Sequence, residues 1–129
     1  QYTMLLDFCQ RAGEQKIPAG ISSEVYLCMN YIRTHTNESI HIEDVAAQIN
    51  RSSSYIMKRF KSELGIHINA YIMRCKLEEA KSLLVYSEKT LSEISNYLCF
   101  SNQSYFQNTF KKQYGITPLQ YRKKHQKIY

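Results

Sequence analysis

The chain of 129 residues is 43% hydrophobic and contains only four glycines and two prolines. We therefore expect one all-α domain with its own core, and exclude a disordered chain or a turn-rich β-sandwich. Three Lys/Arg stand against six Asp/Glu in residues 1–50, a charge of −3, whereas fourteen stand against five in residues 51–129, a charge of +9. This asymmetry predicts a polyanionic partner, nucleic acid before an acidic membrane surface, and a plain solvated basic face is the alternative.

The first part of the chain predicts a lead-in and two helices. Residues 1–20 are expected to be a connector from a missing N-terminal region, with one optional helix over 2–11. A serine-capped helix over 22–36 should follow, because its apolar residues recur every three to four positions. A short helix over 42–49 comes next, with acidic residues in its first turn.

One segment of the chain occurs twice, fifty residues apart. Residues 52–66 and 102–116 are identical at six positions: Ser54/Ser104, Tyr55/Tyr105, Phe60/Phe110, Lys61/Lys111, Gly65/Gly115 and Ile66/Ile116. In each copy we expect a short basic helix that ends at glycine, the residue that most readily takes the left-handed conformation after a helix. Together with the short helix before it, each copy predicts a helix-turn-helix module.

A long helix over 68–86 is predicted between the two copies. Its apolar residues recur at helical spacing on one side, and Lys76 and Lys81 alternate with Glu78 and Glu79 on the other, exposed side. At about 1.5 Å per residue this helix would form a rod of roughly 25 Å.

A second helix pair and a closing helix complete the pattern. Thr90 or Ser92 should start the short helix, residues 99–101 should form a turn one residue longer than the first, and Thr117 should cap the last helix. The basic tail of that helix is expected to fray. The sequence thus predicts about seven helices, arranged as two helix-turn-helix modules and a long central helix, over 21–66, 67–87 and 88–129.

The outward faces of the two repeated helices carry residue types suited to DNA. A major groove admits one α-helix, and the second helix of a helix-turn-helix module lies there. Asn and Gln suit adenine, Lys suits guanine, and Met or Ser carbons suit the thymine methyl group. The residues expected to read bases are Ser53, Ser54, Met57, Lys58, Asn102, Gln103, Ser104, Gln107 and Asn108. Those expected to contact phosphates are Arg59, Lys61, Lys111 and Lys112.

These residues resemble the AraC/XylS family of bacterial transcription regulators over about residues 22–124. The most specific match is the run Ser101-Asn102-Gln103-Ser104-Tyr105-Phe106, then Phe110-Lys111-Lys112, then Tyr114-Gly115-Ile116-Thr117-Pro118. The resemblance implies a cytoplasmic DNA-binding domain over 21–129 that inserts two recognition helices into successive major grooves of promoter DNA. It also implies transcription activation with RNA polymerase as a partner, and any effector would bind the missing N-terminal region.

Three features depart from the family pattern. Ser95 and Cys99 stand where the family usually has Ala and Gly, and a positive φ at position 99 would strain a cysteine. Lys76 stands where the family usually has Arg. The first recognition helix lacks a large polar base reader, which predicts a weaker sequence preference for the first module.

No catalytic site, metal site or cofactor is expected. The four histidines are scattered, and no nucleophile–histidine spacing or phosphate-binding glycine loop occurs. The four cysteines form no C-x-x-C pair, so we expect reduced thiols and no zinc. No apolar run approaches the roughly 20 residues that a membrane span needs. The alternative to DNA binding is a helical protein-interaction module whose basic face meets an acidic protein.

Overall fold

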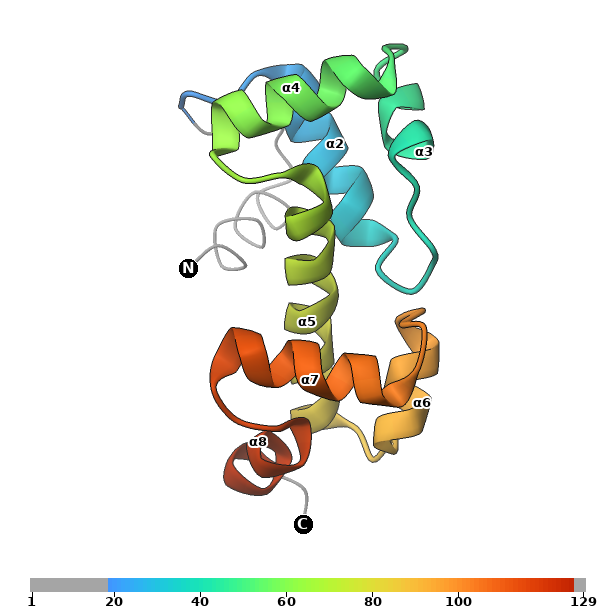
Figure 1. The fold of residues 1–129 in the computed structure, drawn as a ribbon, viewed down its shortest axis with the longest axis vertical. Helices are drawn as coiled ribbons and strands as arrows, with labels where there is room; N and C mark the ends of the chain where they lie inside the picture. The colour runs from blue at the N-terminus through green and yellow to red at the C-terminus, as the bar shows by residue number, and fades with distance from the viewer. Residues whose placement is uncertain (1–18, 127–129) are drawn as a thin grey trace.

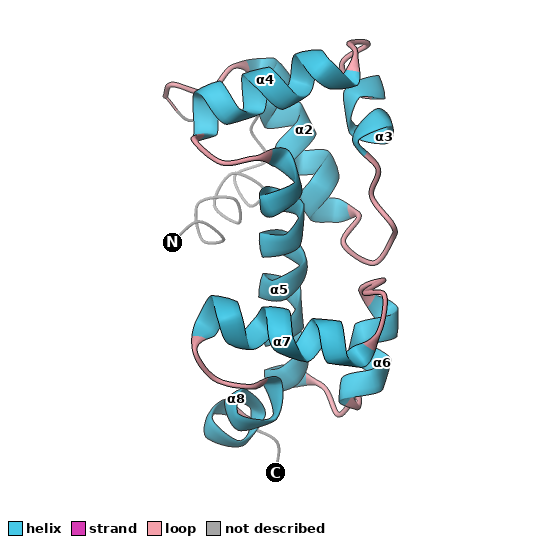
Figure 2. Cartoon of the chain, in the orientation of Figure 1, coloured by secondary structure: helices cyan, strands magenta, loops and turns pink. Residues whose placement is uncertain are grey.

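Seven α-helices and their connecting loops make up the described part of the chain, residues 19–126 (Figure 1). The structure is a computed structural model, and Figure 2 shows no strand within these residues. The helices are α2 (Ser23–Thr34), α3 (Ile42–Ala47), α4 (Ser53–Leu64), α5 (Ile68–Tyr86), α6 (Leu91–Tyr97), α7 (Gln103–Tyr114) and α8 (Pro118–His125). The all-α prediction with two helix pairs around a long central helix is confirmed. The predicted helix over 2–11 and nearly all of the predicted connector lie outside the described residues.

Side-chain caps explain where most of these helices begin. Ser52 Oγ accepts a hydrogen bond from the Tyr55 N–H at 3.1 Å, and Thr90 and Thr117 each form a reciprocal capping box with the third residue of their helix. Each cap satisfies an N–H that has no partner within the helix, which typically stabilises a helix by about 1 kcal/mol. The predicted starts at these three caps are confirmed, whereas α2 and α3 each end two residues earlier than predicted.

Two clusters of buried side chains pack against different halves of α5. The first cluster joins α2, α3 and α4 to the first half of α5, through residues that include Val25, Ile32, Val45, Ile56, Phe60, Tyr71 and Cys75. The second joins α6 and α7 to the second half, through Leu77, Ala80, Leu84, Ile94, Leu98, Phe100, Phe106 and Phe110. Each module therefore has its own core, and α5 is shared by both.

Two residues lie deeper than the sequence predicted. Lys76, assigned to the exposed side of the long helix, has only 6% of its surface exposed, so that assignment was wrong. Phe100, assigned to a turn, is buried in the second core with its ring centroid 5.0 Å from that of Phe106. Helical periodicity could not find either one, because Lys76 is buried by loops from other parts of the chain and Phe100 lies outside any helix.

The basic end of α8 is fastened to α5, contrary to the expected fraying. Arg122 Nε donates to Leu84 O at 3.0 Å, and Gln126 Nε2 donates to Ser87 O at 3.1 Å. These donors satisfy carbonyl groups at the C-terminus of α5, which have no partners within that helix. The last helix therefore caps the central one and is held against it.

The two repeated helices share one orientation in the elongated molecule. In Figure 1, α4 lies across one end of α5 and α7 crosses its other half, and the two run roughly parallel in this view. No helix in residues 19–126 combines the length and the apolar character needed to cross a bilayer.

Candidate nucleic-acid interface

The turns that lead into α4 and α7 start with the same backbone geometry. Asn50 has φ 55° and Cys99 has φ 62°, the left-handed region that most L-residues avoid. The N–H of the following residue donates to the carbonyl five positions back, at 3.2 Å in the first turn and 2.9 Å in the second. This is the Schellman pattern, in which a left-handed residue ends a helix. The positive φ considered for Cys99 is therefore confirmed.

The second turn is one residue longer, in agreement with the sequence. Asn50 lies two residues before the N-cap of α4, whereas Cys99 lies three residues before Asn102, the N-cap of α7. In the longer turn Phe100 enters the core, while Arg51 at the corresponding position of the first turn is exposed. The two modules consequently approach their outward helices by different paths.

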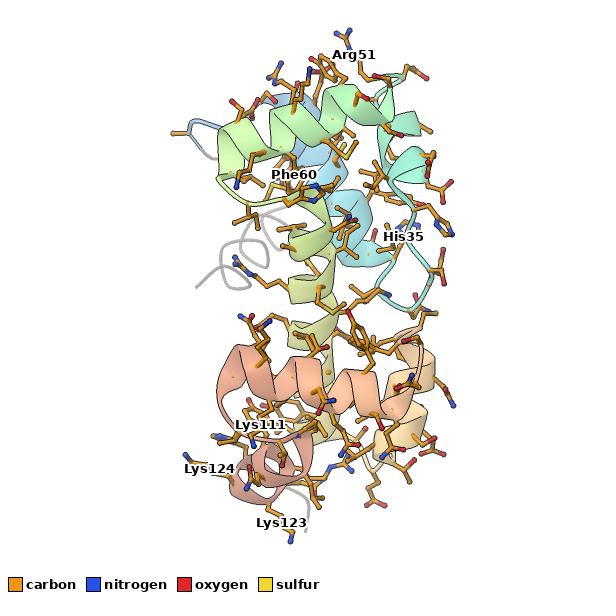
Figure 3. All side chains as sticks on the ribbon, in the orientation of Figure 1. His35, Arg51, Phe60, Lys111, Lys123 and Lys124 are labelled. Atoms are coloured by element: carbon orange, nitrogen blue, oxygen red, sulfur yellow. The ribbon has the colours of Figure 1, made fainter. Side chains whose placement is uncertain are left out.

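α4 presents a short polar face above the first core. Phe60 is fully buried and points inward from this helix (Figure 3). Ser54 and Lys58, two of the predicted base readers, are exposed on the opposite side. Ser53 and Met57 are partly buried, and Met57 packs against the first core. Ser54 and Lys58 are thus the residues of this set that are freest to reach a partner.

Glu24 of α2 holds the start of α4 in place. It accepts hydrogen bonds from Tyr55 Oη at 2.6 Å and from Arg51 Nε at 3.1 Å, and the Arg51 guanidinium lies 4.5 Å from the centroid of the Tyr55 ring. The hydrogen bond from Tyr55, and then that from Arg51, hold the pKa of Glu24 below its ordinary value. Glu24 therefore stays charged and fixes the direction of α4 relative to α2.

A second tie involves Arg59, a predicted phosphate contact. Arg59 Nε donates to Glu63 Oε2 at 2.8 Å, and Glu63 Oε1 accepts from the backbone N–H of Ser22 at 2.7 Å. Burial acts to raise the pKa of Glu63, but the bonds from Ser22 and Arg59 outweigh it and lower the pKa. Arg59 thus has an intramolecular partner, and its phosphate contact stays a prediction. Lys61 is exposed and its Nζ lies 3.3 Å from Gly65 O.

α7 presents a longer polar face than α4. Gln103, Ser104 and Asn108 are exposed, and Gln107 is partly buried. Gln103 Nε2 donates to Gln107 Oε1 at 3.5 Å, so the two amides align one turn apart. Side-chain amides held in a row in this way can each offer a donor and an acceptor to a ligand in front of the helix.

Asn102 has a structural task beside its predicted base contact. Its Oδ1 accepts from the Tyr105 N–H at 2.7 Å and caps α7. The cap occupies the acceptor of this amide and leaves its Nδ2 donors, so bidentate contact with adenine would compete with the cap. Lys111 and Lys112 are exposed in the last turn of α7, and Figure 3 shows Lys111 near that end.

The C-terminal end of α7 is tied to α5 as the first module's helix is tied to α2. Tyr114 Oη donates to Glu78 Oε2 at 2.8 Å, and Lys81 Nζ lies 3.2 Å from the same oxygen. The Lys81 ammonium also lies 4.6 Å from the centroid of the Tyr114 ring. Burial, and then the bond to Glu78, raise the pKa of Tyr114, so its hydroxyl remains a donor.

Known proteins match this arrangement over most of the chain. The family described as a helix-turn-helix domain matches residues 45–124. The xylose operon regulatory protein of Escherichia coli (strain K12) is 40% identical over 98 residues, which cover 76% of this chain and 25% of that protein. The regulatory protein PocR of Salmonella typhimurium is 34% identical over 105 residues, covering 81% of this chain and 35% of PocR. The chain belongs to the AraC/XylS family.

Solved structures of this family share the fold. The structure of the xylose-binding transcription activator xylR superposes with a TM-score of 0.77 at 35% identity, covering 87% of this chain and 30% of that chain. The C-terminal domain of AraT, a response regulator from Geobacillus stearothermophilus, superposes with a TM-score of 0.77 at 31% identity, covering 84% of this chain and 90% of that chain. The DNA-binding domain of AdpA, solved in complex with a target DNA, has the same fold at 22% identity, with a TM-score of 0.73 over 80% of this chain and 93% of that chain.

Membership of the AraC/XylS family makes this chain a DNA-binding domain, as its residues predicted. The chain spans about a quarter of the length of the xylose operon regulatory protein and about a third of PocR. These relatives are regulators rather than enzymes, which agrees with the expectation that the chain has no catalytic role. In a helix-turn-helix module the second helix enters the groove, so α4 and α7 are the recognition helices.

The predicted DNA contacts did not include further basic side chains at the two ends of this AraC/XylS domain. Arg51 projects from one end of the molecule, and Lys123 and Lys124 project from the other (Figure 3). Arg51 directly follows the left-handed Asn50 of the first turn. An asparagine at that point of the sequence, which predicts a turn, could have indicated an exposed position for Arg51. Lys123 and Lys124 were visible as a basic run, but their ordered position depends on the attachment of α8 to α5.

Proposed function

We propose that this chain is the DNA-binding part of a bacterial transcription regulator whose two recognition helices enter successive major grooves on one face of promoter DNA. The observation that carries the proposal is the duplicated module: two capped helices of equal length, roughly parallel in Figure 1, each with a buried apolar row and an exposed polar face. We propose that the DNA-binding domain consists of a first module at 21–66, a linker helix at 67–87 and a second module at 88–129.

The size of α5 suits two readers on one duplex. It has 19 residues, which at about 1.5 Å each span about 28 Å. Successive major grooves on one face of DNA lie about 34 Å apart. Since α4 lies across one end of α5 and α7 crosses its other half, the length of α5 is of the order of the separation that the two readers need.

The base contacts divide between the recognition helices. In the first module we assign them to Ser53, Ser54, Met57 and Lys58, and in the second to Asn102, Gln103, Ser104, Gln107 and Asn108. The second helix carries the larger amide-rich face, so it should contribute more sequence preference. Phosphate contacts fall to Arg59, Lys61, Lys111 and Lys112, with Arg59 shared between phosphate and Glu63.

The remaining functions belong to the full-length protein. The names of the relatives, a xylose operon regulatory protein and a xylose-binding transcription activator among them, support a role in controlling transcription. We propose activation through contact with RNA polymerase in the bacterial cytoplasm, and that any effector binds a part of the protein N-terminal to this domain.

Duplex selection and footprinting test the DNA proposal. Duplexes that bind the chain are selected from a random pool, and guanine N7 protection is then mapped, since N7 faces the major groove. We expect two protected patches about 10–10.5 base pairs apart and an affinity that falls steeply with salt. Binding without sequence preference, or stronger binding to acidic proteins than to any duplex, would overturn the proposal and favour the interaction-module alternative.

A further inference from the structure

The centre of α5 contains a buried lysine whose bonding capacity is fully used. Lys76 Nζ donates to Thr36 O at 2.7 Å, to Glu38 O at 2.7 Å and to Leu98 O at 2.8 Å. An ammonium group has three N–H donors, and here each has a backbone carbonyl. Lys76 has 6% of its surface exposed, so its aliphatic chain is buried together with the charge.

The three acceptors come from both modules. Thr36 and Glu38 lie in the loop between α2 and α3, and Leu98 is the C-cap of α6. The loop carbonyls follow the C-terminus of α2, so the ammonium lies between two helix C-termini, where partial negative charge favours a cation. Burial lowers the pKa of Lys76, while the charge of Glu38 acts in the opposite direction.

Lys76 also stands at the boundary between the two cores. Along α5, Cys75 is the last buried residue of the first cluster and Leu77 is the first buried residue of the second, against which the partly buried Met73 also packs. A weaker contact joins the same two segments, since Cys99 Sγ lies 3.5 Å from Asn37 O. Besides α5 itself, these bonds therefore link the α2–α3 loop to the end of α6.

We propose that Lys76 is a positioning residue that locks the two helix-turn-helix modules in one orientation about α5, and thereby sets the spacing between the two groove sites that one chain can occupy. The locking follows from three short bonds to carbonyls of separate modules. The consequence for groove spacing rests on the proposed function, whereas the locking does not. The locking and the groove spacing are therefore measured separately.

Residual dipolar couplings of the free chain test the locking. In a locked molecule one alignment tensor fits the N–H vectors of both modules, and in an unlocked molecule each module needs its own. We expect one tensor for the wild type and two for Lys76→Met, whose side chain is unbranched and one atom shorter and has no donor. Lys76→Arg keeps the positive charge and the N–H donors, so one tensor should fit both modules of this variant, as in the wild type. Arg74→Met removes an exposed cation from the same helix and is the matched control.

DNA spacing tests the consequence. One base pair inserted between the two halves of a selected duplex turns one half-site by about 35° relative to the other. We expect the wild type to lose about tenfold in affinity and Lys76→Met about twofold, since loosely tethered modules tolerate altered spacing. Lys76→Met should also bind the original duplex more weakly than the wild type does, whereas Arg74→Met should keep the wild-type spacing response.

The outcomes separate this inference from the proposed function. A single tensor and an unchanged spacing response in Lys76→Met would overturn the role of Lys76. If wild-type duplexes show no two-part footprint, the proposed function fails, and the dipolar couplings still decide whether Lys76 locks the modules. Should Lys76→Met give an unfolded spectrum, Lys76→Gln takes its place. Its amide is neutral, is one bond shorter and has two N–H donors for three carbonyls, so we expect two tensors, and a single tensor for this variant would overturn the proposal.

Discussion

At the scale of single residues, the two left-handed positions differ in how well their side chains suit them. Asn50 and Cys99 occupy equivalent points of the two turns, with φ 55° and 62°. Asn visits this region several-fold more often than most residues, because its short polar side chain bonds locally. Cysteine has no such compensation, so the second turn stores strain that the first largely avoids.

Replacing Cys99 by glycine should stabilise the protein. Glycine adopts positive φ without steric cost, so we expect Cys99→Gly to raise the free energy of unfolding by about 1 kcal/mol. Urea unfolding should show a higher midpoint with an unchanged slope. Asn50→Gly is the matched control and should change stability by less. A lower midpoint for Cys99→Gly would mean that the contact from its Sγ to Asn37 O outweighs the strain.

Asn102 combines a cap with a predicted base contact, and two substitutions separate them. Asn102→Ala should cost about 1 kcal/mol of stability, because the Tyr105 N–H loses its acceptor. Asn102→Ser supplies another acceptor and should recover most of that stability. If Asn102 also reads a base, the serine variant will be stable yet less selective at one base pair in binding assays. If Asn102→Ser keeps the full sequence selectivity of the wild type, Asn102 caps α7 but contacts no base.

At the scale of helices, each module is a small core with its own ties to a neighbouring element. Phe60 and Phe110 are fully buried at equivalent positions of the two recognition helices, but in different clusters. The ties are unlike: bonds from Tyr55 to Glu24 and from Ser22 to Glu63 fasten α4 to the start of α2, and a tyrosine–glutamate bond fastens α7 to α5. The duplication therefore preserved the core rather than the polar contacts.

Truncating one of these aromatic side chains should disrupt one module more than the other. Phe60→Ala and Phe110→Ala should each cost about 3–5 kcal/mol, from lost burial and the cavity left behind. Because the cores are separate, N–H signals in NMR spectra should weaken or disappear mainly over α2–α4 in the first variant and over α6–α8 in the second. Equal loss throughout the chain would contradict two independent cores, and an unperturbed spectrum would contradict the burial of these rings.

The tie between α4 and α2 should make the first module sensitive to acid. The pKa of Glu63 is lowered in the folded state, so its stabilisation is complete above the unfolded pKa of about 4.3 and is lost as the pH falls through the folded value. Glu63→Gln should therefore be less stable than the wild type at pH 7, and the difference should shrink by pH 3. Urea unfolding at both pH values measures this. Glu88→Gln, at an exposed loop position, is the control, and a pH-independent difference for Glu63→Gln would refute the tie.

At the scale of the whole molecule, both the distribution of charge and the arrangement of the modules suit binding to DNA. The basic charge lies in residues 51–129, which hold both recognition helices. Exposed lysines lie on α4, α7 and α8, whereas the lysine at the centre of α5 is buried and bonded to both modules. Nonspecific attraction to phosphates would thus come from the surface, and the spacing of the readers from the interior.

Lys58, which is exposed on α4, is the clearest candidate for a base contact from that helix. If it reaches a base, Lys58→Ala should weaken binding to a selected duplex by about 1–3 kcal/mol while changing binding to unrelated duplexes little. Lys61→Ala in the same helix is the matched variant, and it should weaken binding to all duplexes alike and lower the salt slope by about one. Titrations against selected and scrambled duplexes at several salt concentrations distinguish the two. An equal loss on all sequences for Lys58→Ala would make Lys58 a phosphate contact.

The sequence by itself determined what depends on local periodicity and end signals. The apolar spacing and the caps at Ser52, Thr90 and Thr117 predicted seven helices and their order. The internal repeat, read together with the basic charge, predicted two DNA-reading helices. The shorter ends of α2 and α3 escaped prediction. After α2 the backbone of His35 leaves the helical region at φ −125°, and after α3 the chain enters a turn that ends at the left-handed Asn50.

The tertiary structure decided which polar residues are free. Arg59 pairs with Glu63 in its own helix, but Glu63 is itself fixed by the N–H of Ser22, 41 residues away along the chain. Lys76 could not be assigned from its place in an amphipathic pattern, since its three acceptors are 22 to 40 residues away along the chain. Burial of a charge depends on what surrounds it from distant segments, so only the folded molecule shows that this lysine joins the two modules.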